Sequence, residues 1–571
     1  MASSPPSVGS GLLHRSDEPG AAGRLSKRMQ GIAQRLLPAA GLAALVLASS
    51  ATGLANGFAY DDVPVIRENP RAHTLADPLN LFVTSYWPRD HGGALYRPLT
   101  VLGFALQWTI GHGSPLVFHI VSVLLYLALG LLVYALARRI LPPGPAWVAA
   151  AIFAVHPVHV EAVGNVVGQS ELLVALYAAL GVLLYLRARR AEDLRARESV
   201  ALFGLTLLAG LTKETGLMLP AFVAAAELLA VDDRRPLRER ARVLAPTGVL
   251  LGVAVAIVVV MRRFALDTLV GEYAAIPLGG LDARGRLLTM LGVAPEWFRL
   301  LLWPARLSAE YGPPELDAAT TFGARQALGL ALLGLAGAAA LAARRRVPGV
   351  TLGIVWAAIA LFPVSNLAVA TGVLVAERTL MLPSVGLALA LGGAAGGVLR
   401  LPRPARLAAA AAFGLLLAAG AARSAARQRV WRDTLTVLIQ TLRDAPDNYR
   451  AWKQYGIYLK DRGELRAARA ALEQSARMYQ RDAGVYEELG LVRRRQDGCR
   501  SAAPYFERAL AMDPVRSTAR GRLYLCLLEQ GDTARAREVA ATGAELGSWY
   551  FQLQMKILSS GPPARLVSPP R

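Results

Sequence analysis

Two adjacent carboxylates, Asp61 and Asp62, lie in the stretch FAYDDVPVIRENP, directly after an apolar run from about Leu36 to Ala55. A Ser, Thr or sugar hydroxyl is a poor nucleophile until a carboxylate within hydrogen-bond reach accepts its proton. Two neighbouring acids repel each other, which raises one pKa and leaves the other acid ionised. The pair is therefore a candidate for general-base chemistry, and we expect Asp61 rather than Asp62 to take the proton.

More ionisable residues lie at or just beyond the ends of other apolar runs. Such residues are costly at membrane depth and are functional candidates by default. An interfacial cap or a snorkelling side chain is the alternative for each of them, most of all for Glu171. Taken together they place acids and cations on one membrane face, where a charged headgroup and a polar acceptor could meet. The set includes Arg97, Glu161, Glu171, Lys213, Glu214, Glu377 and Arg378.

Two histidines, His156 and His159, lie in HPVHVEAVGNVVGQSE at a spacing of three residues. Side chains at this spacing share a helix face and could bind a metal ion. The sequence shows neither an HExxH pattern nor a third ligand, which favours a structural or pocket-lining role. We therefore expect both histidines to line the pocket and expect no metal site.

The composition is that of a multi-pass membrane protein. The chain has 571 residues, of which 54% are hydrophobic, and a formal net charge of +21. Arg residues cluster in short turns between apolar runs, as the positive-inside rule predicts, so we expect no nucleic-acid partner. The abundance of Ala, Arg and Gly is typical of a GC-rich bacterial genome. Only Cys499 and Cys526 occur, and we expect two free thiols rather than a pair.

Charge distribution predicts the topology. Basic residues before the first apolar run place the N-terminal segment, residues 1–35, in the cytoplasm and Asp61 outside. Residues 36–425 then form a transmembrane domain of about eleven crossings, at roughly twenty residues each. Its first external loop is 56–115 and its large external loop is 262–321. All Arg-rich turns fall on the cytoplasmic side only if the helix at about 286–302 does not cross the membrane. The last crossing then leads out of the cytoplasm.

A repeat follows the transmembrane domain. Trp452, Tyr486 and Arg520 lie 34 residues apart, as do Ala468, Ala502 and Ala536. This period, with a Gly after the aromatic position, resembles the tetratricopeptide repeat (TPR). We expect an α-solenoid over residues 430–550, with repeats at 449–482 and 483–516 and a degenerate third repeat at 517–550. Residues 551–571 are expected to form a disordered Pro-rich tail.

The motifs also carry a family resemblance. FAYDDVPVIRENP, YRPLT, SPLVFHIVSVLLY, AVHPVHVEAVGNVVGQSELL, LTKETG and AERTLMLPSVG, followed by C-terminal TPRs, resemble the transmembrane and TPR-containing O-mannosyltransferases. More broadly, they are similar to the protein O-mannosyltransferase branch of the GT-C glycosyltransferases. The resemblance implies an all-α polytopic membrane protein of GT-C type followed by a TPR solenoid. It runs from about Leu54 to Tyr550.

The resemblance also implies an activity. Such enzymes move a sugar, with inversion, from a polyprenyl- or dolichyl-phosphate carrier to a hydroxyl acceptor on the non-cytoplasmic face, and an acid in the first external loop is the base. That acid maps to Asp61 or Asp62. The substrate and lipid phosphate would be bound by Arg97, Lys213, Glu214, Glu377 and Arg378, and Glu161 would orient the sugar or the acceptor. A monophosphate leaving group needs no divalent metal when cations are in place, so no cofactor is expected.

The expected protein is thus a glycosyltransferase in the inner membrane of a bacterium, with the TPR domain in the periplasm. The acceptor, a protein or a glycan, could be presented by the TPR domain. One alternative is a non-catalytic membrane scaffold that recruits partners through its TPRs. Another is a transporter of lipid-linked sugars, against which the absence of a matching polar inner face argues.

Overall fold

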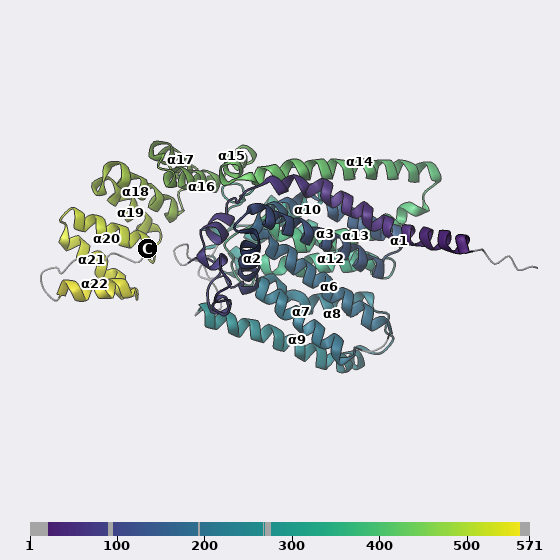
Figure 1. Ribbon diagram of the computed structural model, residues 1–571. Coiled ribbons are helices and arrows are strands. Elements are labelled where there is room, and N and C mark those ends of the chain that lie inside the picture. The colour runs from purple at the N-terminus through teal and green to yellow at the C-terminus, as the bar shows by residue number, and fades with distance from the viewer. Residues whose placement is uncertain (1–20, 89–94, 192–193, 267, 269–275, 560–571) are drawn as a thin grey trace, which may run out of the picture.

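The computed structural model describes residues 21–88, 95–191, 194–266, 268 and 276–559. These residues form helices and connecting loops, with no strand among them. A bundle of helices lies next to a curved array of shorter helices (Figure 1). The described part of the chain is therefore all-α, as predicted.

Fourteen α-helices of the described residues form the bundle. They are α1 (Ala21–Ser50), α2 (Pro98–Gly111), α3 (Pro115–Ile140), α4 (Pro143–Val155), α5 (Val160–Gly164), α6 (Gln169–Ala191), α7 (Ala196–Thr212), α8 (Leu219–Ala230), α9 (Leu237–Leu266), α10 (Ala283–Leu302), α11 (Ala324–Ala343), α12 (Pro348–Leu361), α13 (Met381–Ala395) and α14 (Arg403–Gln428). Single helical turns extend several of them, among them Ala51–Ala55 after α1, Glu214–Met218 before α8 and Glu377–Leu380 before α13.

Seven helices of the described chain are long and apolar enough to cross a membrane, by length and composition alone, or eight if the bent pair α4–α5 is one span. The seven spans are Leu36–Ala55, Pro115–Ile140, Val166–Arg189, Leu237–Leu266, Ala324–Ala343, Glu377–Arg400 and Arg403–Arg432. Helices α7, α8 and α12, with 17, 12 and 14 residues, are shorter than the 18 residues that this criterion requires. The predicted total of about eleven crossings therefore stays a prediction.

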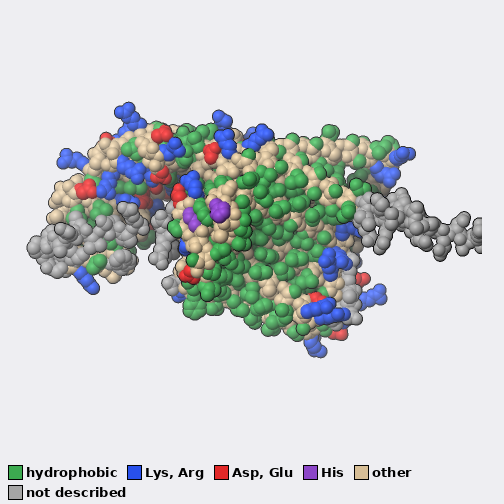
Figure 2. All heavy atoms as spheres, in the orientation of Figure 1, with side chains coloured by type: hydrophobic (Ala, Val, Ile, Leu, Met, Phe, Trp, Pro, Cys, Tyr) green, Lys and Arg blue, Asp and Glu red, His purple; other side chains and the backbone are tan. Residues whose placement is uncertain are grey.

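Apolar side chains cover the middle of the bundle, and charged side chains gather at its ends (Figure 2). The interior is packed mainly by α3, α4, α6 and α13, with Trp356 and Phe222 stacked at 4.2 Å between their ring centroids. The outer faces carry exposed leucines, such as Leu333, Leu335 and Leu415. An apolar belt around a packed interior is the arrangement that lipid tails require.

Helices α15 (Thr434–Asp444), α16 (Tyr449–Asp461), α17 (Leu465–Met478), α18 (Ala483–Asp497), α19 (Cys499–Met512), α20 (Ser517–Glu529), α21 (Thr533–Glu545) and α22 (Trp549–Ser559) form the second unit. The repeat glycines sit where paired helices approach each other. A Cβ on Gly456 would lie 2.6 Å from Leu472 Cγ, and one on Gly490 would lie 2.5 Å from the Phe506 ring. The Gly of the 34-residue period is therefore required by packing within each pair.

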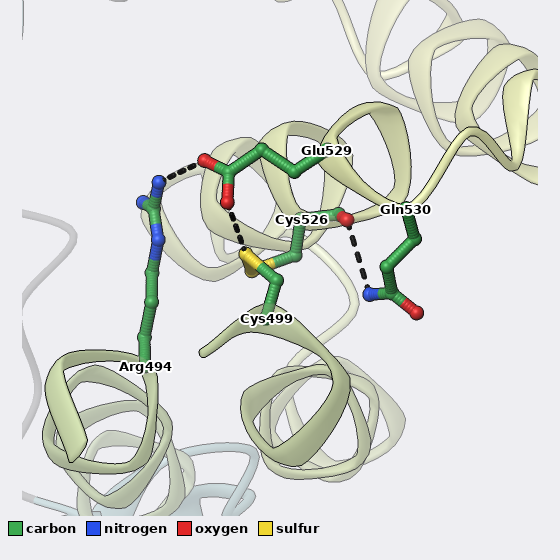
Figure 3. Close-up of a disulfide and its surroundings, with 5 residues drawn as sticks. All are labelled: Arg494, Cys499, Cys526, Glu529 and Gln530. Atoms are coloured by element: carbon green, nitrogen blue, oxygen red, sulfur yellow. Dashed lines mark hydrogen bonds and ion pairs between the residues drawn. A yellow bond between two sulfur atoms is a disulfide. The ribbon is translucent and has the colours of Figure 1, made fainter. Parts of the chain in front are cut away.

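Two expectations for this unit were wrong. Cys499 and Cys526 form a disulfide instead of remaining free thiols, because α19 and α20 bring their Cα atoms to 4.9 Å (Figure 3). Residues 551–559, placed in a disordered tail, continue α22, whose Phe551 is buried against Tyr524 and Gly543. The rest of that tail, like residues 1–20 of the N-terminal segment, lies outside the described residues.

Helix α14 runs along the bundle toward α15, so the solenoid lies at the end of the bundle opposite to the start of α1 (Figure 1). The first loop, after α1, lies at the same end as the solenoid. This end therefore brings together two of the parts of the chain that the sequence predicts to lie outside the cytoplasm, the first loop and the solenoid.

Candidate active site

The loop that carries Asp61 is held by the junction between α14 and α15. Gly57 N donates to Arg432 O at 2.9 Å, and Tyr60 N donates to Thr434 Oγ1 at 3.0 Å. Tyr60 has a φ of 55°, in the left-handed region that a residue with a side chain rarely adopts. The position of Asp61 therefore depends on contacts made by residues far along the chain.

Asp62 serves as a structural link. Its carboxylate is fully buried and accepts hydrogen bonds from the backbone N–H groups of Ala59, Val166 and Val167, at 3.3, 3.2 and 2.9 Å. Burial raises its pKa to about 7, and these hydrogen bonds oppose the rise. Since both oxygens are occupied and no part of the side chain reaches the surface, the geometry favours Asp61 as the candidate base.

Asp61 is partly exposed and faces a cation. Its Oδ2 lies 3.2 Å from Arg378 Nη2, and 21% of its side chain is accessible. Burial raises the pKa of Asp61, while Arg378, and more weakly Arg97, lower it. A carboxylate with a raised pKa on a partly accessible side chain is suited to accept a proton.

Arg378 is fixed by Glu161. Its Nη1 lies 2.7 Å from Glu161 Oε1, and its backbone N–H donates to Glu161 Oε2 at 2.8 Å. The Glu161 side chain is only 1% accessible. One buried acid therefore orients both the backbone and the guanidinium of Arg378, which brings Asp61, Glu161 and Arg378 together as predicted.

A second cluster surrounds Glu214. Arg97 donates to Glu214 Oε2 through Nε and Nη2, at 3.1 and 3.0 Å, and Arg262 Nη1 lies 3.5 Å from Glu214 Oε1. The Arg97 guanidinium also lies 5.1 Å from the centre of the Tyr86 ring. A small pocket beside Arg97 is lined partly by Arg71 and Tyr86. Glu214 therefore contacts one arginine through each of its carboxylate oxygens.

Lys213 pairs with Glu171, and both side chains are buried, with 8% and 2% accessible. Glu171 is therefore neither an interfacial cap nor a snorkelling side chain, because it neutralises a cation inside the protein. Breaking a buried pair on one side leaves an uncompensated charge.

Lys213→Met is expected to destabilise the protein by about 3–5 kcal/mol, since Glu171 loses its partner. The double variant Lys213→Met/Glu171→Gln should recover most of that loss in a thermal unfolding measurement in detergent. Unchanged stability of the single variant would contradict a buried pair.

The histidines do not line an open pocket, which corrects the prediction. His156 Nε2 contacts Leu301 O at 2.9 Å, and its Nδ1 accepts from Val158 N. The ring nitrogens of His159 contact Tyr126 OH at 2.9 Å and Ser384 Oγ at 2.7 Å. All four ring nitrogens have protein partners, so both rings hold neighbouring segments together.

Glu377 also differs from its predicted role. Its Oε1 accepts hydrogen bonds from Ser308 N and Tyr311 OH, both at 2.6 Å. The side chain is 2% exposed and is directed to the loop before α11 rather than to the cations. Glu377 therefore anchors a loop and is not available to bind a substrate phosphate.

Sequence reasoning missed three residues of this region: Arg262, Tyr86 and Glu310. Arg262 follows a long apolar run at its predicted outer end, where the positive-inside rule expects no cation. That exception was the signal that could have identified it. In the described ranges no group of three or more His, Cys, Asp or Glu side chains is arranged to hold a metal ion; a metal-independent reaction stays a prediction.

The chain resembles known protein mannosyltransferases in sequence. Residues 98–261 match the family model described as dolichyl-phosphate-mannose-protein mannosyltransferase. The chain is 25% identical over 507 residues to the protein O-mannosyl-transferase Tmtc3 of Drosophila melanogaster, which covers 76% of this chain and 54% of the relative. The predicted family resemblance is confirmed.

Two mammalian relatives show a similar degree of identity to this chain. Mouse TMTC3 is 24% identical over 493 residues, covering 80% of this chain and 53% of the relative. Human TMTC4 is 26% identical over 483 residues, covering 72% of this chain and 62% of the relative. Both are protein O-mannosyl-transferases by name. The chain spans about half the length of the curated relatives it matches first. The family-model match includes Glu161, Lys213 and Glu214, whereas Asp61 and Arg378 lie outside it.

Proposed function

We propose that this chain is a membrane glycosyltransferase that moves mannose, or a similar sugar, from a polyprenyl-phosphate carrier to a hydroxyl acceptor. The observation that carries the proposal is the partly exposed Asp61 carboxylate beside Arg378, in a chain that resembles the O-mannosyltransferases. The curated relatives are named protein O-mannosyl-transferases, which supports a hydroxyl group of a protein as the acceptor.

The reaction is a single displacement. The acceptor oxygen attacks the anomeric carbon while Asp61 takes the hydroxyl proton, and the bond between that carbon and the phosphate oxygen breaks. The lipid phosphate leaves with the electron pair. Since the developing state is oxocarbenium-like and the attack comes from the face opposite the leaving group, the product has the inverted configuration.

The cations divide into two sets. Arg378 pairs with Asp61 and Glu161, so these acids balance its charge on the side of the site where the acceptor hydroxyl would bind. Arg97 and Arg262 share the Glu214 carboxylate, whereas Lys213 is neutralised by its buried pair with Glu171. We assign the leaving lipid phosphate to this second set, because preorganised cations stabilise charge as it develops on the phosphate.

The site is proposed to face the non-cytoplasmic side. Arg-rich turns, such as the segment between α8 and α9, lie at the opposite end of the bundle from the solenoid (Figures 1 and 2). The disulfide in the solenoid supports the same orientation, because disulfides persist in oxidising compartments.

A scaffold role cannot be separated from catalysis by deleting residues 430–571. That deletion removes Arg432 and Thr434, which hold the Asp61 loop, so it damages the site as well as the solenoid. A point variant at Asp61 leaves the solenoid intact and is the discriminating change.

The proposal is tested with the purified chain in liposomes that contain polyprenyl-phosphate mannose and a Ser/Thr-containing acceptor peptide. We expect transfer to the peptide, an inverted anomeric product and no transfer from a nucleotide-linked mannose. Absence of transfer from any lipid-linked sugar, or equal transfer from the nucleotide sugar, would contradict it.

The pH dependence follows from Asp61. Only its ionised form accepts a proton, and burial holds its pKa above the ordinary carboxyl value. The acid limb of the transfer rate should therefore lie above the range of about 4 that is usual for Asp, with activity falling as the pH decreases through it. Rates of initial transfer across a pH series measure the limb, and a limb at or below the ordinary Asp value would be inconsistent with this assignment.

A further inference from the structure

The loop before α11 contains a four-residue segment, Ser308–Tyr311, that touches three separate parts of the protein. It contacts the Asp61 loop through Tyr60, the start of α13 through Glu377, and the first repeat through Arg450. We call Ser308–Tyr311 the bridging segment. It connects the solenoid to both partners of the Asp61–Arg378 pair.

The contact with the Asp61 loop is made by a buried carboxylate. Glu310 is 8% exposed, and its Oε1 accepts a hydrogen bond from the hydroxyl of Tyr60, the residue before Asp61. A tyrosine in the left-handed region is strained and persists only when its surroundings hold it there. Glu310 at the side chain and Thr434 at the backbone supply that restraint.

The contact with Arg378 runs through its neighbour. The backbone N–H of Ser308 and the hydroxyl of Tyr311 both donate to Glu377 Oε1, at 2.6 Å each. Glu377 begins the helical turn Glu377–Leu380, whose second residue is Arg378. The bridging segment therefore restrains the turn from which the Arg378 guanidinium extends.

The contact with the solenoid is made by the second carboxylate oxygen of Glu310. Arg450 Nε donates to Glu310 Oε2 at 2.8 Å, and Asn448 Nδ2 donates to the backbone carbonyl of Glu310 at 3.1 Å. Both residues belong to the start of α16, the first helix of the first repeat. The pair is largely buried, with 19% of the Arg450 and 9% of the Glu310 side chain accessible.

We propose that Arg450 is a positioning residue of the active site, which acts through Glu310 and Tyr60 to hold Asp61 in its working geometry toward Arg378. This inference rests on the proposed glycosyltransferase function. The first repeat is then a structural part of the catalytic centre, in addition to any role in recognising the acceptor. The Glu310 carboxylate binds Tyr60 through one oxygen and Arg450 through the other. It therefore transmits a displacement of the first repeat to Tyr60, the residue before Asp61.

The charges around Asp61 provide a readout that loss of packing alone would not produce. The groups that face it are the cations Arg378, Arg97 and Arg450, the acids Glu310, Asp62 and Glu161, and the phenols of Tyr60 and Tyr86. Of the pair in question, Glu310 raises the pKa of Asp61 and Arg450 lowers it. Neutralising Arg450 should therefore move the acid limb of the rate to higher pH, and neutralising Glu310 should move it to lower pH.

The experiment compares full-length Arg450→Met, Glu310→Gln and Arg450→Lys with wild type in the liposome assay. Arg469→Met is the matched control, since Arg469 lies on α17 of the same repeat in an exposed pair with Glu473. We expect Arg450→Met and Glu310→Gln to lower kcat by about 10- to 100-fold, the scale of small misplacements in a site. The KM for the lipid donor should change by about twofold or less, because uniform binding of the donor is preserved.

The acid limb should move to higher pH in Arg450→Met and to lower pH in Glu310→Gln, and Arg450→Lys should recover part of the rate. A second measurement needs no activity: hydrogen exchange of the backbone amides in residues 56–67 should accelerate in Arg450→Met and not in Arg469→Met. This readout also applies to a variant with little residual transfer.

Wild-type exchange rates over residues 56–67 in Arg450→Met, or kinetics equal to those of Arg469→Met, would overturn the positioning role. Limbs that move in the same direction in the Arg450 and Glu310 variants would also overturn it. If Asp61→Asn transfers sugar at the wild-type rate, the proposed function fails instead; the exchange measurement then still decides whether Arg450 restrains the loop.

Discussion

Replacing Asp61 with asparagine is expected to lower the rate of sugar transfer by about 10²- to 10⁴-fold, the range usual for loss of a general base. Asparagine keeps the shape of the side chain but cannot accept the hydroxyl proton. Arg378 keeps its two hydrogen bonds to Glu161 in this variant, so the fold should persist. Initial rates in the liposome assay measure the effect, and gel filtration with thermal unfolding checks the fold.

Asp62→Asn is the matched control for this prediction. Asp62 accepts three backbone hydrogen bonds, and an amide offers only one oxygen for them. Its main effect should therefore be a loss of about 1–3 kcal/mol of stability, the cost of buried groups left unsatisfied. A wild-type rate for Asp61→Asn, or a larger rate loss in a stably folded Asp62→Asn than in Asp61→Asn, would contradict the assignment of the base.

Arg378→Met is expected to have the second-largest effect, because it acts on both stability and transfer. The variant leaves the Glu161 carboxylate, of which 1% is accessible, without its guanidinium partner. Removing one member of a buried pair costs about 3–5 kcal/mol. Transfer should also fall, since Asp61 loses the cation that orients it and lowers its pKa.

The double variant Glu161→Gln/Arg378→Met separates these two effects. It should regain most of the stability, because no uncompensated charge is left, while transfer stays low. Arg67→Met serves as a control in the same loop, since the Arg67–Glu68 pair is exposed and such pairs contribute about 0–1 kcal/mol. Equal unfolding temperatures for Arg378→Met and Arg67→Met would contradict the role given to Glu161.

The sequence alone predicts which residues gather at one end of the bundle. Apolar periodicity and the positive-inside rule place Asp61, Glu161 and Arg378 on one face, and the structure joins them as a network of ion pairs. Topology cannot say which acid takes which cation, because pairing depends on distances between segments remote in the chain. The pairs of Lys213 with Glu171 and of Arg97 with Glu214 are examples.

Other features depend on tertiary contacts that no local pattern records. His156 and His159 have the spacing of a shared face, but the bend between α4 and α5 directs their nitrogens to the backbone and to buried hydroxyls. Cys499 and Cys526 are 27 residues apart, out of phase with the repeat of 34, so the periodicity did not show that α19 and α20 align them.

The dependence of hydroxyl glycosylation on the Asp61 carboxylate is the property on which the proposed function rests. It is tested most directly by quantitative mass spectrometry of secreted and surface proteins from cells that lack the chain, complemented with wild type or Asp61→Asn. We predict hexose-modified Ser or Thr peptides that disappear on deletion, return with wild type and stay absent with Asp61→Asn at equal expression. Return of the same modified peptides with the Asp61→Asn variant would show that Asp61 is not the base.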